Sequence, residues 1–252
     1  MSGKDTPFFV GYLPVPPGLR LLLIAVAAAL AGIFAVVGWG WAVSQSDPGA
    51  GAFRFDYGEQ TVTGVLQAEP YPILHVSSGS ERIATGRTIM LAGQGKRGVL
   101  DRAAPLDGKL VQAKGIILKR GDLDMLQLQG GANGLSGAEG GGGAPVATPL
   151  GRWKLAGEIC DGKCLAGAMR PGTGLGHKAC ANLCLAAGVP PVFVSSQPVE
   201  GSQYLLLADA DGGPLPDWLY DRTAIFLTIE GDIERRGDLL IFRVDPASIE
   251  VL

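Results

Sequence analysis

Hydrophobic and polar positions follow different patterns in successive parts of the chain. Leu21 to Val43 is an apolar run without a single charged residue. Such a run is long enough for a helix to cross a hydrocarbon core of about 30 Å. A secretory signal peptide is the alternative, but its apolar region is shorter, roughly 7–15 residues. The pattern therefore predicts a transmembrane helix over 21–43, preceded by a cytoplasmic or interfacial lead-in over 1–20.

Beyond this run, after a polar connector over 44–59, short apolar runs typical of β-strands follow one another. In a first region over 60–129 they predict strands near 60–68, 71–77, 87–93, 109–119 and 123–129. A glycine-rich stretch over 130–149 has no apolar periodicity and predicts a flexible linker. In a second region over 150–252 the predicted strands lie near 152–160, 191–197, 203–209, 222–234 and 238–244.

The two β-rich regions resemble each other. Lys119-Arg120-Gly121-Asp122 matches Arg235-Arg236-Gly237-Asp238, and a glycine, Gly115 or Gly231, precedes each match at the same spacing. Each region has a turn-rich or helix-like stretch between its third and fourth strands. A five-stranded barrel with a helix at that place is the OB-fold arrangement. The sequence thus predicts a mainly β protein with two tandem OB-like barrels, with a generic small β-sandwich as the alternative.

The cysteines of the chain all lie between the first and second strands of the second region. This insert also contains one of the two histidines. Its candidate ligands are Cys160, Cys164, His177, Cys180 and Cys184.

A short helix is predicted over Gly176 to Ala187, ended by Gly188 and two prolines. Its spacing puts His177, Cys180 and Cys184 on one helix face. In OB barrels the loop that holds this insert and the loop between strands 4 and 5 form the binding rim. That rule places Arg235 and Arg236 on the same rim as the insert, unless they form only a solvated turn.

Several chemistries fit these cysteines. Two disulfides would suit an exported domain, with Cys160 or Cys164 paired to Cys180 or Cys184. Thiolates and one imidazole also make a tetrahedral zinc set. That set would be Cys164, His177, Cys180 and Cys184.

Two further chemistries stay open. Haem could use His177 and Met169 as axial ligands, although the CxxCH attachment run is absent. Thiol–disulfide exchange is the other, although the usual C-x-x-C spacing is absent. No Ser/His/Asp set or carboxylate pair is legible, so no catalytic residue is predicted.

The net charge and the positions of the cations indicate which partners are excluded and where the chain is located. The net charge of −3 argues against binding to nucleic acid, which requires a basic footprint. Arg20 precedes the apolar run and no cation follows it closely, so the N-terminus is predicted to be cytoplasmic. Trp39 and Trp41 would then lie at the outer membrane interface, and the bulk of the chain would be periplasmic, anchored in a bacterial inner membrane.

The sequence of the insert also contains a motif that resembles one in other proteins. The insert contains the motif GEI-x-D-x-K-C, followed by M-x-PG-x-G, H-K-x-C-A, C and G-x-PP. This motif resembles a signature of a family of uncharacterised bacterial membrane-anchored proteins. The lead-in VGYLPVPPGLR is similar to that of the same proteins. Cys160 departs from the signature. The resemblance implies these motif positions: Gly157, Lys163, Cys164, Met169, His177, Cys180, Cys184 and the Pro190-Pro191 turn.

Together these features favour binding over catalysis. The sequence predicts a non-enzymatic accessory, assembly or docking subunit of a membrane redox complex, which contacts a membrane or periplasmic protein through the insert. Lys163 and Met169 join the predicted contact surface. The alternative is a periplasmic metal or haem chaperone, whose layout of one span and an OB barrel is similar. Neither hypothesis needs a small-molecule substrate, and zinc or haem would be the cofactors only in the second.

Overall fold

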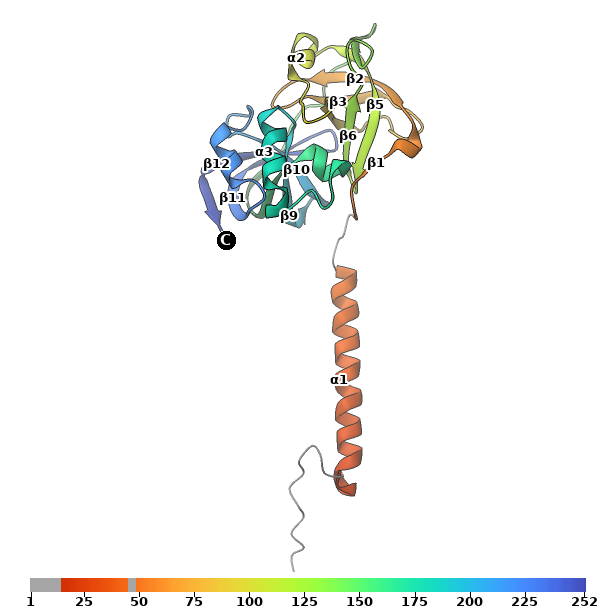
Figure 1. Ribbon diagram of the computed structural model, residues 1–252, viewed down its shortest axis with the longest axis vertical. Helices are drawn as coiled ribbons and strands as arrows, with labels where there is room; N and C mark the ends of the chain where they lie inside the picture. The colour runs from red at the N-terminus through yellow and green to blue at the C-terminus, as the bar shows by residue number, and fades with distance from the viewer. Residues whose placement is uncertain (1–14, 45–48) are drawn as a thin grey trace, which may run out of the picture. The chain divides into compact units, whose positions relative to one another are not determined.

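The structure is a computed structural model that describes residues 15–44 and 49–252. The chain divides into two compact units, Met1–Asp47 and Pro48–Leu252, and each is described by itself. It is mainly β, as predicted (Figure 1). Most of the predicted lead-in over 1–20 lies outside the described residues.

The first unit contains α1 (Pro17–Ser44), which includes the whole of the predicted span. It is long and apolar enough to cross a membrane, and it is the one such helix in the described part of the chain. At a rise of 1.5 Å per residue, its 28 residues extend over about 42 Å. Arg20 lies in its first turns, and Trp39 and Trp41 lie near its end. All three side chains are exposed.

A first sheet of seven strands opens the second unit. β4 and β6 are parallel, and the other pairs are antiparallel. A short helical stretch, α2 (Leu100–Ala103) and η2 (Ala104–Leu106), connects β4 to β5. The strands are β1 (Ala52–Phe53), β2 (Gln60–Gln67), β3 (Ile73–Ser78), β4 (Thr88–Ala92), β5 (Leu110–Arg120), β6 (Leu123–Leu128) and β7 (Leu135–Gly137).

Five of these strands match those predicted for the first region. The structure adds β1 inside the expected connector and β7 inside the expected linker, and both pair with β5. β5 also pairs with β2 and β6, so the pairings form a ring in the order β2-β3-β4-β6-β5.

The second β body is a closed five-stranded barrel. Its pairings run β8-β9-β10-β12-β11, which is the order of the ring in the first sheet, again with one parallel pair. A 3₁₀ segment, η5 (Asp217–Arg222), lies between its third and fourth strands. The strands are β8 (Thr148–Asp161), β9 (Pro191–Val199), β10 (Ser202–Ala208), β11 (Phe226–Arg236) and β12 (Leu239–Val251).

The repeated glycines mark close approaches between strands. A Cβ atom on Gly115 of β5 would lie 2.0 Å from the carbonyl oxygen of Gln127 in β6. On Gly231 of β11 it would lie 2.2 Å from the carbonyl oxygen of Arg243 in β12. Real Cβ atoms do not come so near to backbone, so only glycine fits at these two corresponding positions.

The first sheet and the second barrel share a hydrophobic core. Strand residues alternate between faces, so Ile89 and Leu91 of β4 fill the core of the first sheet whereas Met90 faces the second barrel. Met90 lies in one buried cluster with Leu206 of β10 and Ile241 of β12. Burial on both faces explains the unbroken apolar sequence of β4. The two β bodies therefore form one compact unit and are not separate domains joined by a flexible linker.

The hairpin between β11 and β12 belongs to this interface. The carboxylate of Asp238 accepts a 2.7 Å hydrogen bond from the backbone of Thr88 in β4 and forms an ion pair with Arg87. Arg236 is mostly buried against Glu234, and Arg235 forms a loose ion pair with Glu200.

The strand register separates this hairpin from the insert. It pairs Arg235 with Thr148 at the start of β8, whereas the insert leaves β8 at its other end. The structure thus does not bring Arg235 and Arg236 to the cysteines, contrary to the expectation of a shared rim. The hairpin instead packs against the first sheet.

Candidate functional site

The insert starts from a buried carboxylate. Asp161, the last residue of β8, is fully buried, and its Oδ1 accepts a 2.8 Å hydrogen bond from the backbone N–H of Cys164. A side chain placed in this way satisfies an otherwise unpaired N–H at the start of a helical turn. The turn is η3 (Cys164–Ala168), a wide π-type turn. Asp161 therefore fixes the position of Cys164 relative to the barrel.

A helix brings the remaining cysteines to this turn. A 3₁₀ turn, η4 (Leu175–His177), leads into α3 (Lys178–Ala186), and Gly188 with a φ of +83° ends the helix. The helix predicted over Gly176 to Ala187 is confirmed. Cys180 and Cys184 are four positions apart, so both project from the same face of α3.

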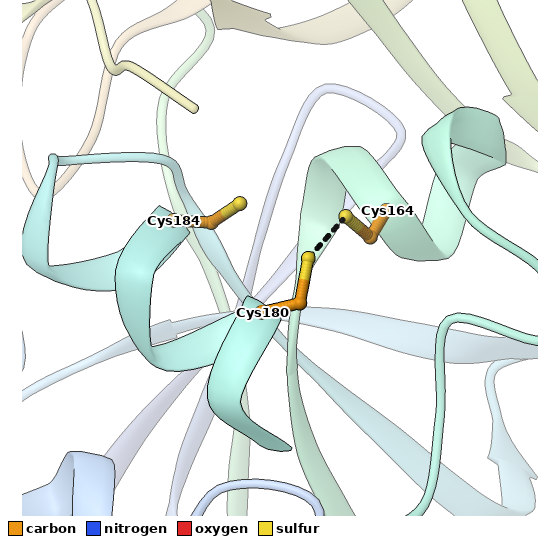
Figure 2. Close-up of side chains that lie close together, drawn as sticks. All are labelled: Cys164, Cys180 and Cys184. Atoms are coloured by element: carbon orange, nitrogen blue, oxygen red, sulfur yellow. Dashed lines mark hydrogen bonds between the residues drawn. The ribbon is translucent and has the colours of Figure 1, made fainter. Parts of the chain in front are cut away.

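Three cysteine side chains meet between α3 and the turn. Cys180 and Cys184 project from α3 toward Cys164, as Figure 2 shows. The Sγ atoms of all three lie within 4.8 Å of one another, and those of Cys164 and Cys180 are 3.8 Å apart. Cys164 and Cys184 are buried, whereas Cys180 is partly exposed. These residues are called the cysteine trio below.

The expected disulfides are not formed: all four cysteines are free. The 3.8 Å between the sulfurs of Cys164 and Cys180 is well above the roughly 2.05 Å of an S–S bond. Cys160 is not part of the trio. It lies on β8, where Ile159 faces the core of the second barrel, and Cys160 lies in the core shared with the first sheet. Strand alternation thus separates it from the other thiols.

A second group of donor atoms adjoins the trio. His177 is buried, with Nε2 2.7 Å from Oδ2 of Asp161 and Nδ1 3.0 Å from Sδ of Met169. A ring nitrogen of His177, a carboxylate oxygen of Asp161 and Sγ of Cys164 also lie within 4.8 Å of one another. The expected zinc set of Cys164, His177, Cys180 and Cys184 is therefore divided into two groups that share Cys164.

The first sheet contributes to this site through one loop. The loop over 93–98 connects β4 to the segment before α2, and its Lys96 donates a 2.6 Å hydrogen bond to Sγ of Cys180. The loop is held at both ends. Lys163 of the insert, 3% exposed, donates to the carbonyl oxygens of Gly93 and Gly95. Gly98 donates a 2.7 Å hydrogen bond to the carbonyl oxygen of Ala187, just after α3.

Burial, hydrogen bonds and nearby charges shift the pKa values of the thiols in different directions. Hydrogen bonding with Cys184, together with burial, raises the pKa of Cys164. The same hydrogen bond lowers the pKa of Cys184, and the nearby charge of Lys96 lowers it further. The hydrogen bond with Cys180 raises the pKa of Lys96. Burial raises the pKa of Cys160 well above its usual range, as for an inert structural thiol.

Two residues of the site were not anticipated. Asp161 stands within the motif GEI-x-D-x-K-C, and its position three residues before Cys164 is that of a capping side chain. Lys96 has no comparable signal, because a single lysine in a glycine-rich loop resembles any solvated loop residue. Lys163 and Met169, both predicted for the contact surface, do lie at the site, Lys163 buried and Met169 40% exposed.

Comparison with known proteins does not assign this chain to a family, because no family model, curated protein or solved structure shows significant similarity to it.

Proposed function

We propose that this chain is a membrane-anchored metal-binding protein and that the cysteine trio holds a thiophilic metal ion. The observation that carries the proposal is the convergence of the Sγ atoms of Cys164, Cys180 and Cys184 within 4.8 Å. Metal–sulfur bonds of about 2.3 Å place neighbouring sulfurs roughly 3.8 to 4.0 Å apart. The separation of 3.8 Å between Cys164 and Cys180 fits that requirement.

The electrostatics of the site support this proposal. Thiolates, and not thiols, bind metals. The lowered pKa of Cys184 favours its thiolate form, and Lys96 lies beside Cys180 to offset the negative charge. Soft thiolate sets select ions such as Cu(I) and Zn²⁺ over oxygen-preferring ions such as Mg²⁺.

The observed contacts favour a bare metal ion over haem. Iron between two axial ligands needs bonds on the order of 2 Å to each of them. Nδ1 of His177 and Sδ of Met169 are 3.0 Å apart, and a haem would have to place its whole macrocycle between them, whereas a bare ion needs only the flexible Met169 side chain to move. The proposal therefore keeps the metal-chaperone alternative drawn from the sequence and leaves haem aside.

The scaffold and its location belong to the same proposal. The shared pairing order of the two β bodies supports the interpretation that they are duplicated OB barrels. We place both of them in the periplasm of a bacterium, anchored in its inner membrane by α1, with the N-terminus in the cytoplasm. This orientation rests on Arg20 before the span and on the lack of a nearby cation after it.

The proposal is tested on the full chain purified in detergent. Its metal content is measured by mass spectrometry of the elements and compared among Cys164→Ala, Cys180→Ala and Cys184→Ala. Cys160→Ala is the matched control, because Cys160 is equally a buried thiol but lies outside the trio. One metal ion per chain in the parent and the control, with loss in the other three variants, is the expected result. A metal-free parent whose unreduced mass shows a disulfide would contradict it.

A second candidate, docking to a membrane redox complex as an accessory or assembly subunit, is favoured by the surface of the insert. Leu175 and Leu183 are 71% and 61% exposed, both next to the site. Exposed apolar side chains next to a site are suited to burial against another protein. Native electrophoresis of solubilised membranes tests this. If docking occurs, Leu175→Ser/Leu183→Ser shifts the chain from a larger assembly to a smaller one, whereas unchanged migration would argue against it.

A further inference from the structure

A line of donor atoms leads from the protein surface to the cysteine trio. Met169 is 40% exposed, and its sulfur touches Nδ1 of the buried His177 at 3.0 Å. A ring nitrogen of His177 lies within 4.8 Å of Sγ of Cys164, and Cys164 belongs to the trio. Exposure thus falls sharply from Met169 to His177, which is only 2% exposed. Thioether, imidazole and thiolate follow one another over distances that a bound ion could cross by exchanging one ligand at a time.

The hydrogen bond to Asp161 aims His177 at Met169. A carboxylate accepts hydrogen bonds but does not donate them, so Nε2 of His177 carries the proton shared with Asp161. Nδ1, on the other side of the ring, lies 3.0 Å from the thioether sulfur of Met169, which has no hydrogen to donate. Two electron-pair donors that face each other suit a cation between them. A carboxylate that orients a metal-binding histidine in this way is a common outer-shell arrangement.

The number and type of the available ligands distinguish between metals. Zinc prefers four ligands, but the trio supplies three and, among the described residues, the tight group includes no fourth His, Asp or Glu. Lys96 occupies the side of Cys180 instead. Thioether sulfur is a soft ligand that favours Cu(I).

We propose that the ion is Cu(I) and that it enters through Met169 and His177 and then passes by way of Cys164 into the cysteine trio. This inference rests on the proposed function and adds the identity of the metal and its route. The flexible Met169 side chain moves outward by about an ångström to admit the ion. Each thiol that binds releases its proton to solvent, and copper stays in the +1 state, so no electron is transferred.

The test measures loading and affinity separately. The full chain in detergent, kept anaerobic, takes copper from a coloured Cu(I)–chelator complex, and the decay of the colour gives the rate of loading. Met169→Leu removes the thioether but keeps the apolar volume. We expect it to slow loading by about tenfold or more while the equilibrium affinity, set by the trio, changes less than about twofold. Val146→Ala is the control, because Val146 is an exposed apolar residue without a donor atom and lies outside the insert.

Two further measurements make the outcomes decisive. Zinc uptake by Met169→Leu should equal that of the parent, and X-ray absorption of the loaded protein should show copper bound by sulfur alone. Loading of Met169→Leu at the parent rate, or a preference for zinc when both ions compete, would overturn the inference while leaving the metal site intact. Failure of the proposed function looks different, because Cys180→Ala and Cys184→Ala would then bind as much copper as the parent.

Discussion

The side-chain nitrogen of Lys96 lies 2.6 Å from the sulfur of Cys180, although 84 positions separate the two residues in the sequence. Lys96 belongs to the first sheet, and Cys180 belongs to the insert of the second barrel. The site is therefore complete only when the two β bodies are packed together. The first sheet therefore takes part in the site, because it supplies a cation to the cysteine trio.

Loss of that cation should weaken metal binding. In Lys96→Gln the negative charge of the metal–thiolate group is no longer offset next to Cys180. We expect the metal affinity to fall by about three- to tenfold, a modest effect because Lys96 is exposed and screened by solvent. The difference should shrink at high ionic strength. Competition titrations at low and high salt measure it. Arg97→Gln, the adjacent exposed cation of the same loop, serves as the control, and an equal loss in that variant would speak against a local role for Lys96.

Metal affinity should rise with pH. Hydrogen bonding with Cys184 and burial raise the pKa of Cys164, so this thiol keeps its proton through the neutral range in the metal-free protein. The metal must displace that proton, and each displaced proton makes binding about tenfold tighter per pH unit. The pKa of Cys184 is lowered, so this thiol contributes less than Cys164 to the dependence of affinity on pH.

Dissociation constants measured from pH 6 to 8 test this dependence, together with the protons released on binding. The affinity of the parent should fall as the pH is lowered, and each ion bound should release at least one proton. A dissociation constant that stays constant over this range would contradict the assigned protonation of Cys164.

Strand positions were predictable from the sequence because each strand carries its own local signal. Alternating residues and glycine-rich turns located β2 and β11, and the position of Gly188 located the end of α3. The apolar run of β4 located the strand, but it did not say what covers either face. That information lies in the packing of Met90 against the second barrel, which no local pattern encodes.

The errors at the site have the same origin. Counting cysteines predicted two disulfides, but the alternation along β8 turns Cys160 away from the trio and into the shared core. The loop rule for OB barrels placed Arg236 on the binding rim, whereas the hairpin packs against the first sheet through Asp238 and Thr88. Lys96 could not be found at all, because its role depends entirely on how two β bodies dock.

Asp161 should be required for the architecture of the site. Its two carboxylate oxygens accept from the backbone of Cys164 and face Nε2 of His177, and its side chain is fully buried. Asp161→Asn keeps the shape but loses the charge and one acceptor. We expect a loss of about 1–3 kcal/mol in the free energy of unfolding. Chemical denaturation of the detergent-solubilised chain measures it, with the exposed Asp232→Asn as control. Equal stability of Asp161→Asn and the parent would exclude a positioning role.

A single methyl group at Gly98 should uncouple the first sheet from the metal site. A Cβ atom there would lie 2.0 Å from the carbonyl oxygen of Gly188, immediately after α3, so the loop over 93–98 must move away in Gly98→Ala. Overpacking of this kind costs about 1–3 kcal/mol of stability. The displaced loop also withdraws Lys96, so the loss in metal affinity should match that of Lys96→Gln, and combining the two variants should add little. Gly130→Ala is the control, because a Cβ atom at Gly130 meets nothing within 4 Å. If the two losses in affinity were fully additive, the loop would act on the cysteine trio by a route other than Lys96.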